Sequence, residues 1–394
     1  MQEANRLKRL PLYLFTIIDE LKKRARDKGM DVIDFGMGSP DQPAPAHVVQ
    51  RLCESAQITE NHRYSRPDGE VERRLRRTIA NWYKGRFGIE LDPETEVLPL
   101  IGSKEGIAHL CLAFLNNDDF VIVPSPAYPV HFNGVIIAGG VLYNIPIVQE
   151  KGFLPDLSSI PKEVVKRAKL MFLSYPHNPT GAVCDIHFFE EVVNWASGKN
   201  ILIAHDLTYS DIVFDGYKAP SFLQVKGAKE MGVEFHTLSK SYNMAGWRIG
   251  FVVGNAEILK TLGKTKSYLD FGIFRAVQEA AVAALEGPQD CVEKMVKLYK
   301  ERRDALVDGL NAVGWKTEKP KATFYVWTRI PPKYSALTAL EFAKLLVDEI
   351  GVAVAPGTGF GEYGEGYVRF ALVESVERIR LALQRIKGFL DVKS

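Results

Sequence analysis

The sequence predicts an α/β protein whose larger domain holds a mostly parallel sheet flanked by helices and whose smaller domain is α+β. Five short, almost wholly apolar runs alternate with helical stretches between residues 97 and 237. That pattern is typical of a parallel sheet covered on both faces. After about Gly287 a long charged helix and scattered short strands follow instead. The 394 residues also exceed the size at which a single core usually stops growing.

We therefore expect residues 1–44 to form an N-terminal arm and part of the small domain. Residues 45–286 form the large domain and residues 287–394 the small C-terminal domain. Within the first segment, an arm at 11–15 leads into an amphipathic helix that ends near Lys28. A short strand at 32–35 then breaks into a Gly/Pro turn. Such a turn lets the backbone approach a ligand closely, or is plain punctuation.

In the large domain, helices are expected at 47–57 and 70–86, with a turn at 64–69 between them. A further helix starts at Ser103, where apolar residues recur on one face, and another covers 188–196. The expected strands are 97–101, 119–123, 169–174, 201–205 and 233–237.

The small domain is expected to contain helices at 292–312 and 374–389 and strands at 322–327, 352–355 and 367–371. Residues 359–364 match the GxGxxG pattern of dinucleotide-binding proteins. Another glycine and another strand follow, so no helix N-terminus is available for a pyrophosphate. We interpret this segment as a mobile glycine loop beside the active cleft.

Composition excludes several function classes. A formal charge of +2, with basic and acidic residues interspersed, gives no concentrated basic face for a nucleic acid. The basic run 22–26 is flanked by acidic residues and is interpreted as a solvated helix face. No apolar stretch is long enough for a membrane span, and the N-terminus has no secretory pattern. A cytoplasmic protein is expected.

Metal and disulfide sites are also not indicated. The four cysteines are scattered without a CxxC pair, as is common for reduced thiols. The eight histidines show no HExxH or similar spacing, so we expect no metal.

Polar residues suited to catalysis stand just after the apolar strands. Strand ends in one parallel sheet meet at the same edge, so these residues are expected to share one cleft. In chain order they are Ser103 with Lys104, Tyr128, Asn178, Asp206 and Lys240.

The run at 235–250 is the centre of this constellation. Lys240 lies between two serines, and Arg248 follows eight residues later. An amine can form a Schiff base with a phosphate-bearing aldehyde, while hydroxyls and a guanidinium hold the phosphate. A solvated turn after a strand would explain the triplet alone equally well.

The upstream strand ends would serve the same cofactor. Ser103 and Lys104 begin a helix, whose free N–H groups favour a phosphate, although a simple helix cap has the same sequence. Asp206 ends a very apolar strand and is either structural or paired with a cation such as a pyridinium nitrogen.

The remaining candidates each have a structural alternative. Asn178 could donate to a phenolate oxygen or form an Asn-Pro turn, and Tyr209 could reach the same oxygen or belong to the core. Tyr128 could stack on a flat ring or simply pack. Arg369 lies inside an apolar strand and needs an anion, either a substrate carboxylate or a buried partner such as Glu374.

Taken together, the motifs resemble the fold-type I pyridoxal-phosphate aminotransferases of class I/II across almost the whole chain. More narrowly, the segments around Asp206 and Lys240 are similar to those of bacterial alanine (glutamate–pyruvate) aminotransferases, with the LL-diaminopimelate aminotransferases as close relatives. The motifs are 102–106, 126–129, Asn178-Pro179-Thr180-Gly181, Asp206-x-x-Tyr209, Ser239-Lys240 with Arg248, and Arg369.

The resemblance implies that Lys240 carries pyridoxal 5′-phosphate as a Schiff base and then shuttles a proton. Asp206 keeps the pyridinium protonated, Asn178 and Tyr209 bind the ring oxygen, and Tyr128 stacks on the ring. The implied phosphate ligands are Ser103, Lys104 through backbone amides, Thr237, Ser239 and Arg248. Many members have serine where Thr237 stands, which keeps the hydroxyl.

The resemblance also assigns the substrate and partner contacts. Arg369 and Asn178 clamp the α-carboxylate, and Gly38 lines the site. Family members are homodimers with active sites at the interface, and Tyr64 would reach the phosphate of the partner's cofactor. Arg275 lies in the segment from which aspartate-specific members offer an arginine across the interface, and its alignment to that role is open.

The expected function is transamination between an L-amino acid and a 2-oxo acid, with alanine and 2-oxoglutarate as first choice. The alternatives are LL-diaminopimelate aminotransferase, aspartate aminotransferase and cystathionine β-lyase, which share the cofactor residues. A transcription regulator with an aminotransferase-like domain is disfavoured, because the recognisable motifs begin near Gly38 and leave no room for a DNA-binding extension.

Overall fold

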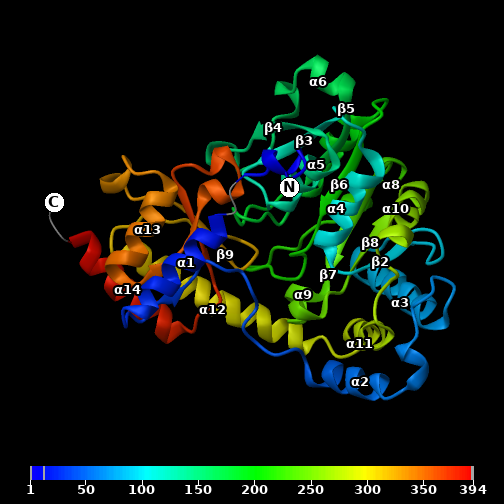
Figure 1. The fold of residues 1–394 in the computed structure, drawn as a ribbon, viewed down its shortest axis with the longest axis horizontal. Coiled ribbons are helices and arrows are strands. Elements are labelled where there is room, and N and C mark those ends of the chain that lie inside the picture. The colour runs from blue at the N-terminus through cyan, green and yellow to red at the C-terminus, as the bar shows by residue number, and fades with distance from the viewer. Residues whose placement is uncertain (1, 12–13, 392–394) are drawn as a thin grey trace.

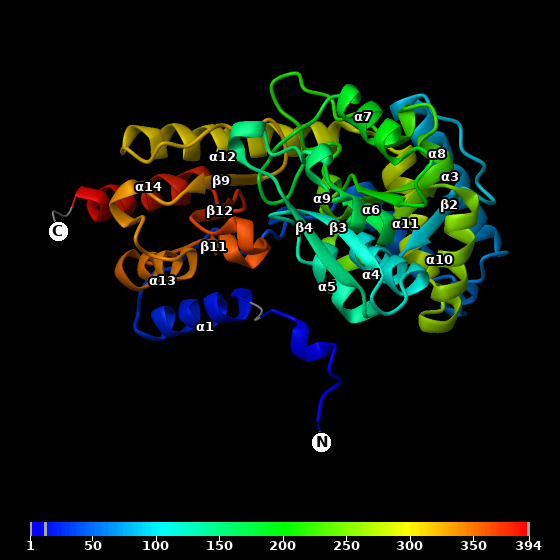
Figure 2. The ribbon, with the colours of Figure 1, turned by 90° about the horizontal axis from the view of Figure 1, so that it is seen from above.

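The structure is a computed structural model that describes residues 2–11 and 14–391. Two residues of the expected arm, Leu12 and Tyr13, lie outside the described residues. The helices and strands form a larger lobe around a central sheet and a smaller lobe beside it (Figure 1). The long helix α12 (Asp290–Ala312) runs from beside α11 (Arg275–Glu286) into the smaller lobe, as both ribbon views show (Figure 2).

The central sheet confirms the predicted fold class. Its order in the described chain is β2-β8-β7-β6-β5-β3-β4. β8 pairs antiparallel with both β2 and β7, and the other neighbouring strands are parallel. The strands are β2 (Val97–Leu100), β3 (Phe120–Ser125), β4 (Val141–Pro146), β5 (Ala168–Leu173), β6 (Leu202–Asp206), β7 (Gly232–Thr237) and β8 (Gly250–Gly254).

Helices cover both faces of this sheet because side chains alternate along each strand. Val121 and Phe172 pack with one set of helices, while Ile122 and Met171 pack with the other. The first set is α4 (Ser103–Phe114), α5 (Val130–Ala138) and α10 (Ala256–Leu269). The second set is α2 (Ala46–Ala56), α3 (Glu70–Phe87), α7 (Ile186–Ala196) and α11. Short helices are α6 (Lys162–Arg167), α8 (Ala228–Met231) and α9 (Leu238–Ser241).

The smaller lobe has its own apolar cluster, to which both ends of the chain contribute, from Ile18 to Ile386. Helix α1 packs beside α13, so the N-terminal helix belongs to this lobe (Figure 2). The bounds 1–44, 45–286 and 287–394 stay a prediction. The helices are α1 (Leu14–Asp27), α12, α13 (Ala339–Ile350) and α14 (Val376–Asp391). The strands are β1 (Ile33–Asp34), β9 (Tyr325–Arg329), β10 (Val352–Ala353), β11 (Ala355–Pro356) and β12 (Tyr367–Ala371).

Two strand predictions in this lobe were wrong in their bounds. β9 begins three residues later than expected, because Thr323 has a positive φ of 67° that interrupts extended backbone. The strand expected at 352–355 is divided, since β10 pairs with β1 while β11 pairs with β12. The 359–364 segment forms two 3₁₀ turns before β12, which confirms that no helix follows its glycines.

No helix among the described residues is both long and apolar enough to cross a membrane.

Candidate active site

A cavity of about 380 Å³ lies where the carboxyl ends of the parallel strands face the smaller lobe. It gathers residues from both lobes, and all the predicted site residues except Tyr64 line it. Predicted residues in the lining are Gly38, Ser103, Lys104, Tyr128, Asn178, Asp206, Tyr209, Thr237, Ser239, Lys240, Arg248 and Arg369. Six further residues line it that were given no site role above, although Gly102 and Pro129 belong to the quoted motifs: Met37, Gly102, Pro129, Thr208, Ala245 and Tyr325.

Lys240 is placed by the abrupt change from β7 to α9. Thr237 caps the one-turn helix by accepting a hydrogen bond from the backbone N–H of Ser239. The Lys240 amine donates to the carbonyl of Gly38 at 3.1 Å. The residue as a whole is half-buried, but burial of the amine lowers the pKa of Lys240, and the charges of Arg369 and Arg248 lower it further. A larger fraction is then the neutral amine, which is the nucleophilic form.

Asp206 is a buried anion at the end of β6. Its carboxylate lies 3.2 Å from Nε2 of His131 and accepts hydrogen bonds from the backbone N–H and hydroxyl of Thr208. Burial opposes ionisation, but these contacts outweigh it and the pKa of Asp206 is lowered. A permanent negative charge at this depth is suited to a cationic ring nitrogen.

The N-terminus of α4 forms a cradle for an anion. Gly102 precedes the helix with φ +82°, and its α-carbon lies against the side chain of Arg248. A methyl group at Gly102 would lie 2.5 Å from a terminal nitrogen of the Arg248 guanidinium, which would then have to move away from the helix N-terminus. Thr237 donates from its hydroxyl to Ser239 at 2.9 Å on the neighbouring loop. Helix N–H groups, hydroxyls and a guanidinium are the donors that a phosphate needs.

Arg369 on β12 is held between polar and aromatic groups. It donates to Oδ1 of Asn178 at 2.9 Å and to the carbonyl of Gly36 at 3.1 Å. Its guanidinium carbon lies 3.9 Å from the ring centroid of Tyr325. Glu374, the alternative partner considered above, accepts from the backbone N–H of Asp34 at 3.0 Å. The planar guanidinium is thus fixed at the cavity wall, in a form that suits a carboxylate.

Two tyrosines complete the wall. The hydroxyl of Tyr209 donates to that of Tyr325 at 3.0 Å, and burial together with Tyr325 raises the pKa of Tyr209 well above its ordinary value. Tyr209 is therefore a neutral phenol at physiological pH. Tyr128 is half-buried, and the ammonium of Lys104 lies 6.0 Å from its ring centroid.

Tyr64 lies outside the cavity. It is 77% exposed and contacts the edge of Phe271, with 5.0 Å between ring centroids. Arg275 donates to the carbonyls of Glu60 and Tyr64, each at 2.8 Å, and so holds the Tyr64 segment within its own chain.

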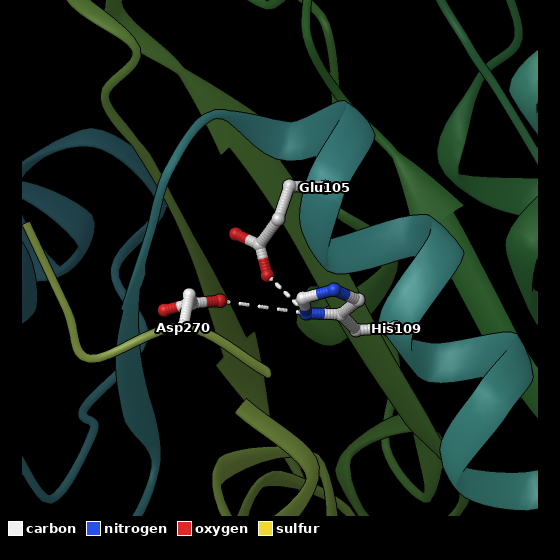
Figure 3. Close-up of side chains that lie close together, drawn as sticks. All are labelled: Glu105, His109 and Asp270. Atoms are coloured by element: carbon white, nitrogen blue, oxygen red, sulfur yellow. Dashed lines mark ion pairs between the residues drawn. The ribbon is translucent and has the colours of Figure 1, made fainter. Parts of the chain in front are cut away.

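Glu105 and His109 on α4 lie close to Asp270 at the end of α10, and the three superficially resemble metal ligands (Figure 3). His109 is 2.5 Å from Glu105 and 3.7 Å from Asp270. The Lys266 ammonium contacts the carboxylates of Glu105 and Asp270, each at 3.0 Å, and so balances their negative charge. We interpret the cluster as an ion-pair network.

The comparisons with known proteins agree with this geometry. The family model described as Aminotransferase class I and II matches residues 30–386. The chain belongs to the class I and II aminotransferases. This aminotransferase is 51% identical to the glutamate–pyruvate aminotransferase AlaC of Escherichia coli, over 97% of the chain and 92% of that protein. It is 48% identical to an LL-diaminopimelate aminotransferase of Moorella thermoacetica, over 99% of each.

Among solved structures, the apo structure of BacF from Bacillus subtilis superimposes with a TM-score of 0.94 at 36% identity, covering 99% of this chain and 98% of that one. Fold-type I aminotransferases use pyridoxal 5′-phosphate, and so does this family member.

The residues of the cavity fit that cofactor. The pKa of Lys240 is lowered, and the buried carboxylate of Asp206 stays charged. The guanidinium of Arg248 lies against Gly102 at the N-terminus of α4. Each of these would serve a different part of a phosphorylated pyridine aldehyde.

Proposed function

We propose that this aminotransferase exchanges the amino group of L-alanine with 2-oxoglutarate, giving pyruvate and L-glutamate. The charge distribution of the cavity favours this substrate pair over LL-diaminopimelate. Asp206 is the sole carboxylate among the described lining residues, and in this proposal it serves the ring nitrogen of the cofactor. The lining therefore offers cations for the carboxylates of glutamate but no acidic side chain for the second ammonium group of LL-diaminopimelate.

In this proposal the wall residues bind and orient the substrate. Arg369 and Asn178 hold the α-carboxylate, and Lys104 at the cavity rim attracts the second carboxylate of glutamate. Bound pyridoxal 5′-phosphate supplies an electron-withdrawing ring. Lys240 would hold the cofactor through its amine and would carry a proton there, and the anionic Asp206 would hold the proton on the ring nitrogen.

The second candidate is LL-diaminopimelate aminotransferase, which is favoured by the names of several relatives at 46–51% identity. A partner subunit could supply the acidic group that this lining lacks. Aspartate specificity has less support, because the guanidinium of Arg275 is engaged by two carbonyls of its own chain. Cystathionine β-lyase activity remains the last alternative.

A half-reaction screen tests the proposal. The holoenzyme is mixed separately with L-alanine, L-glutamate, L-aspartate and LL-diaminopimelate, and the visible absorbance of the bound cofactor is followed. Alanine and glutamate are expected to convert it to the aminated form fastest. Faster conversion by LL-diaminopimelate would establish the second candidate. Lys240→Ala is the control, because turnover retained without this amine would refute the role of Lys240 itself.

The proposal includes a homodimer in the cytoplasm. Exposed aromatic side chains gather around the Tyr64 segment, where Phe271 contacts Tyr64 and is 59% exposed, and Phe274 contacts His62 and is 47% exposed. Exposed aromatic patches of this kind are common at subunit interfaces. Light scattering of the purified protein should give twice the 44.1 kDa chain mass, and cell fractionation tests the location.

A further inference from the structure

Tyr325 is the first residue of β9 and lies buried where the two lobes meet. Its hydroxyl accepts a hydrogen bond from Tyr209 at 3.0 Å, and its ring lies 3.9 Å from the guanidinium carbon of Arg369. A methyl group placed on Gly38 would lie 2.1 Å from the Tyr325 hydroxyl oxygen, so this hydroxyl packs directly on the Gly38 backbone. Tyr325 thus touches three site segments that are far apart in sequence.

We infer that Tyr325 is a positioning residue whose ring and hydroxyl act separately, the ring on Arg369 and the hydroxyl on Tyr209. This inference rests on the proposed function, in which Arg369 binds the substrate carboxylate and Tyr209 faces the cofactor oxygen.

The ring sets the plane of the carboxylate-binding group. Two hydrogen bonds, to Asn178 and Gly36, fix the edge of the Arg369 guanidinium. They leave its flat face to be supported by the ring of Tyr325, with Phe360 at 4.5 Å as a second aromatic neighbour. A guanidinium over an aromatic face gains cation–π attraction, and this gain is larger in a desolvated site. An aliphatic side chain at 325 would leave both hydrogen bonds but remove that support.

The hydroxyl acts as one member of a two-hydroxyl relay. A phenol has a single O–H, so Tyr209 cannot donate to Tyr325 and to a cofactor oxygen at once. When an anionic oxygen is bound in the cavity, the two hydroxyls can turn together, so that Tyr325 donates to Tyr209 and Tyr209 donates to the anion. Hydrogen bonds in such a chain strengthen one another. The tight contact with Gly38 keeps the Tyr325 oxygen in place for this reversal.

The test compares Tyr325→Phe, which keeps the ring, with Tyr325→Leu, which removes it, in the holoenzyme. Tyr209→Phe and the double variant Tyr209→Phe/Tyr325→Phe complete a cycle. The first readout, without substrate, is the pH midpoint of the visible absorbance of bound pyridoxal phosphate. The second is KM against kcat for alanine and glutamate, and melting temperatures monitor folding.

Tyr325→Phe is expected to raise the midpoint by about 0.5 pH unit, because Tyr209 becomes a weaker donor to the anion. It should leave both KM values within about threefold, because the cation–π contact persists. In the Tyr209→Phe background the same change should have no further effect on the midpoint. Tyr325→Leu is expected to raise KM for both amino acids by roughly 5- to 30-fold, because the cation–π contact is lost.

The inference fails if Tyr325→Phe titrates like the wild type, or if its shift and that of Tyr209→Phe simply add. It fails equally if Tyr325→Leu leaves KM unchanged. These outcomes are distinct from failure of the proposed function, which would show in the half-reaction screen as faster conversion of the wild-type holoenzyme by LL-diaminopimelate and would leave the pH midpoints of the variants as they are.

Discussion

Replacing Gly102 with alanine is expected to weaken cofactor binding in addition to destabilising the fold. At φ +82° and ψ 150°, a region that is almost restricted to glycine, an alanine costs about 1–3 kcal/mol. The new methyl would also lie 2.5 Å from the Arg248 guanidinium, which must therefore move away from the N-terminus of α4. Losing one charge-assisted hydrogen bond to a phosphate costs about 1.5–3 kcal/mol, or roughly a ten- to hundredfold rise in Kd.

Gly198→Ala is the control for a positive-φ substitution. Gly198 has φ +71°, and no atom lies within 4 Å of its added methyl, so this variant has no clash with a side chain. Urea unfolding should show that both variants of the apo protein lose stability. Titration of the apo protein with pyridoxal phosphate should show the rise in Kd in Gly102→Ala alone. Equal Kd values in the two variants would refute the assignment of Arg248 to the phosphate.

Three further predictions concern charge and geometry around the cavity. His177 has a pKa lowered to about 3 by burial and then by the nearby His131. Between pH 3 and about 6.5 the unfolded chain binds more protons at this group, so stability should rise with pH there, by up to about 1.4 kcal/mol per unit. Urea unfolding across that range should show a shallower slope for His177→Asn; an unchanged slope would contradict the assignment. Asp206→Asn should lower kcat roughly a hundredfold or more, because the ring nitrogen loses its anionic partner, and near-normal steady-state kinetics would exclude that role. Arg275→Ala removes two hydrogen bonds to the Tyr64 segment, and Arg275 does not line the described cavity. We expect weaker self-association by light scattering and an unchanged preference between alanine and aspartate; a change in that preference would restore Arg275 as a specificity residue.

The sequence was sufficient to predict most of the cavity because its residues follow strands of one parallel sheet. Strand ends are recognisable from local apolar runs, and the sheet itself brings them together. Asp206 and Lys240 were found in this way, and the structure places both in one cavity.

The residues that were missed depend on contacts between distant segments. His131 lies on α5, one turn beyond Tyr128, and only the packing of that helix brings it to Asp206. Tyr325 lies at the start of a strand whose expected position was three residues too early. Neither side chain stands in a local pattern that marks it as functional. Tyr64 does not line the described cavity and is 77% exposed, so its predicted contact with a cofactor phosphate needs a second copy of the chain.

The connection between Arg369 and Gly36 spans 333 residues, and that between Lys240 and Gly38 spans 202. The anion cradle, by contrast, lies entirely between Gly102 and Arg248. During synthesis, the residues up to Arg248 emerge before β12, so the phosphate donors are available before the carboxylate anchor Arg369. Closing the long loop between Gly36 and Arg369 also costs more conformational entropy than closing the shorter one between Gly102 and Arg248. Selectivity for an amino acid is therefore acquired after the capacity to hold a phosphorylated ring, and it is the first property that loosening of the smaller lobe would remove.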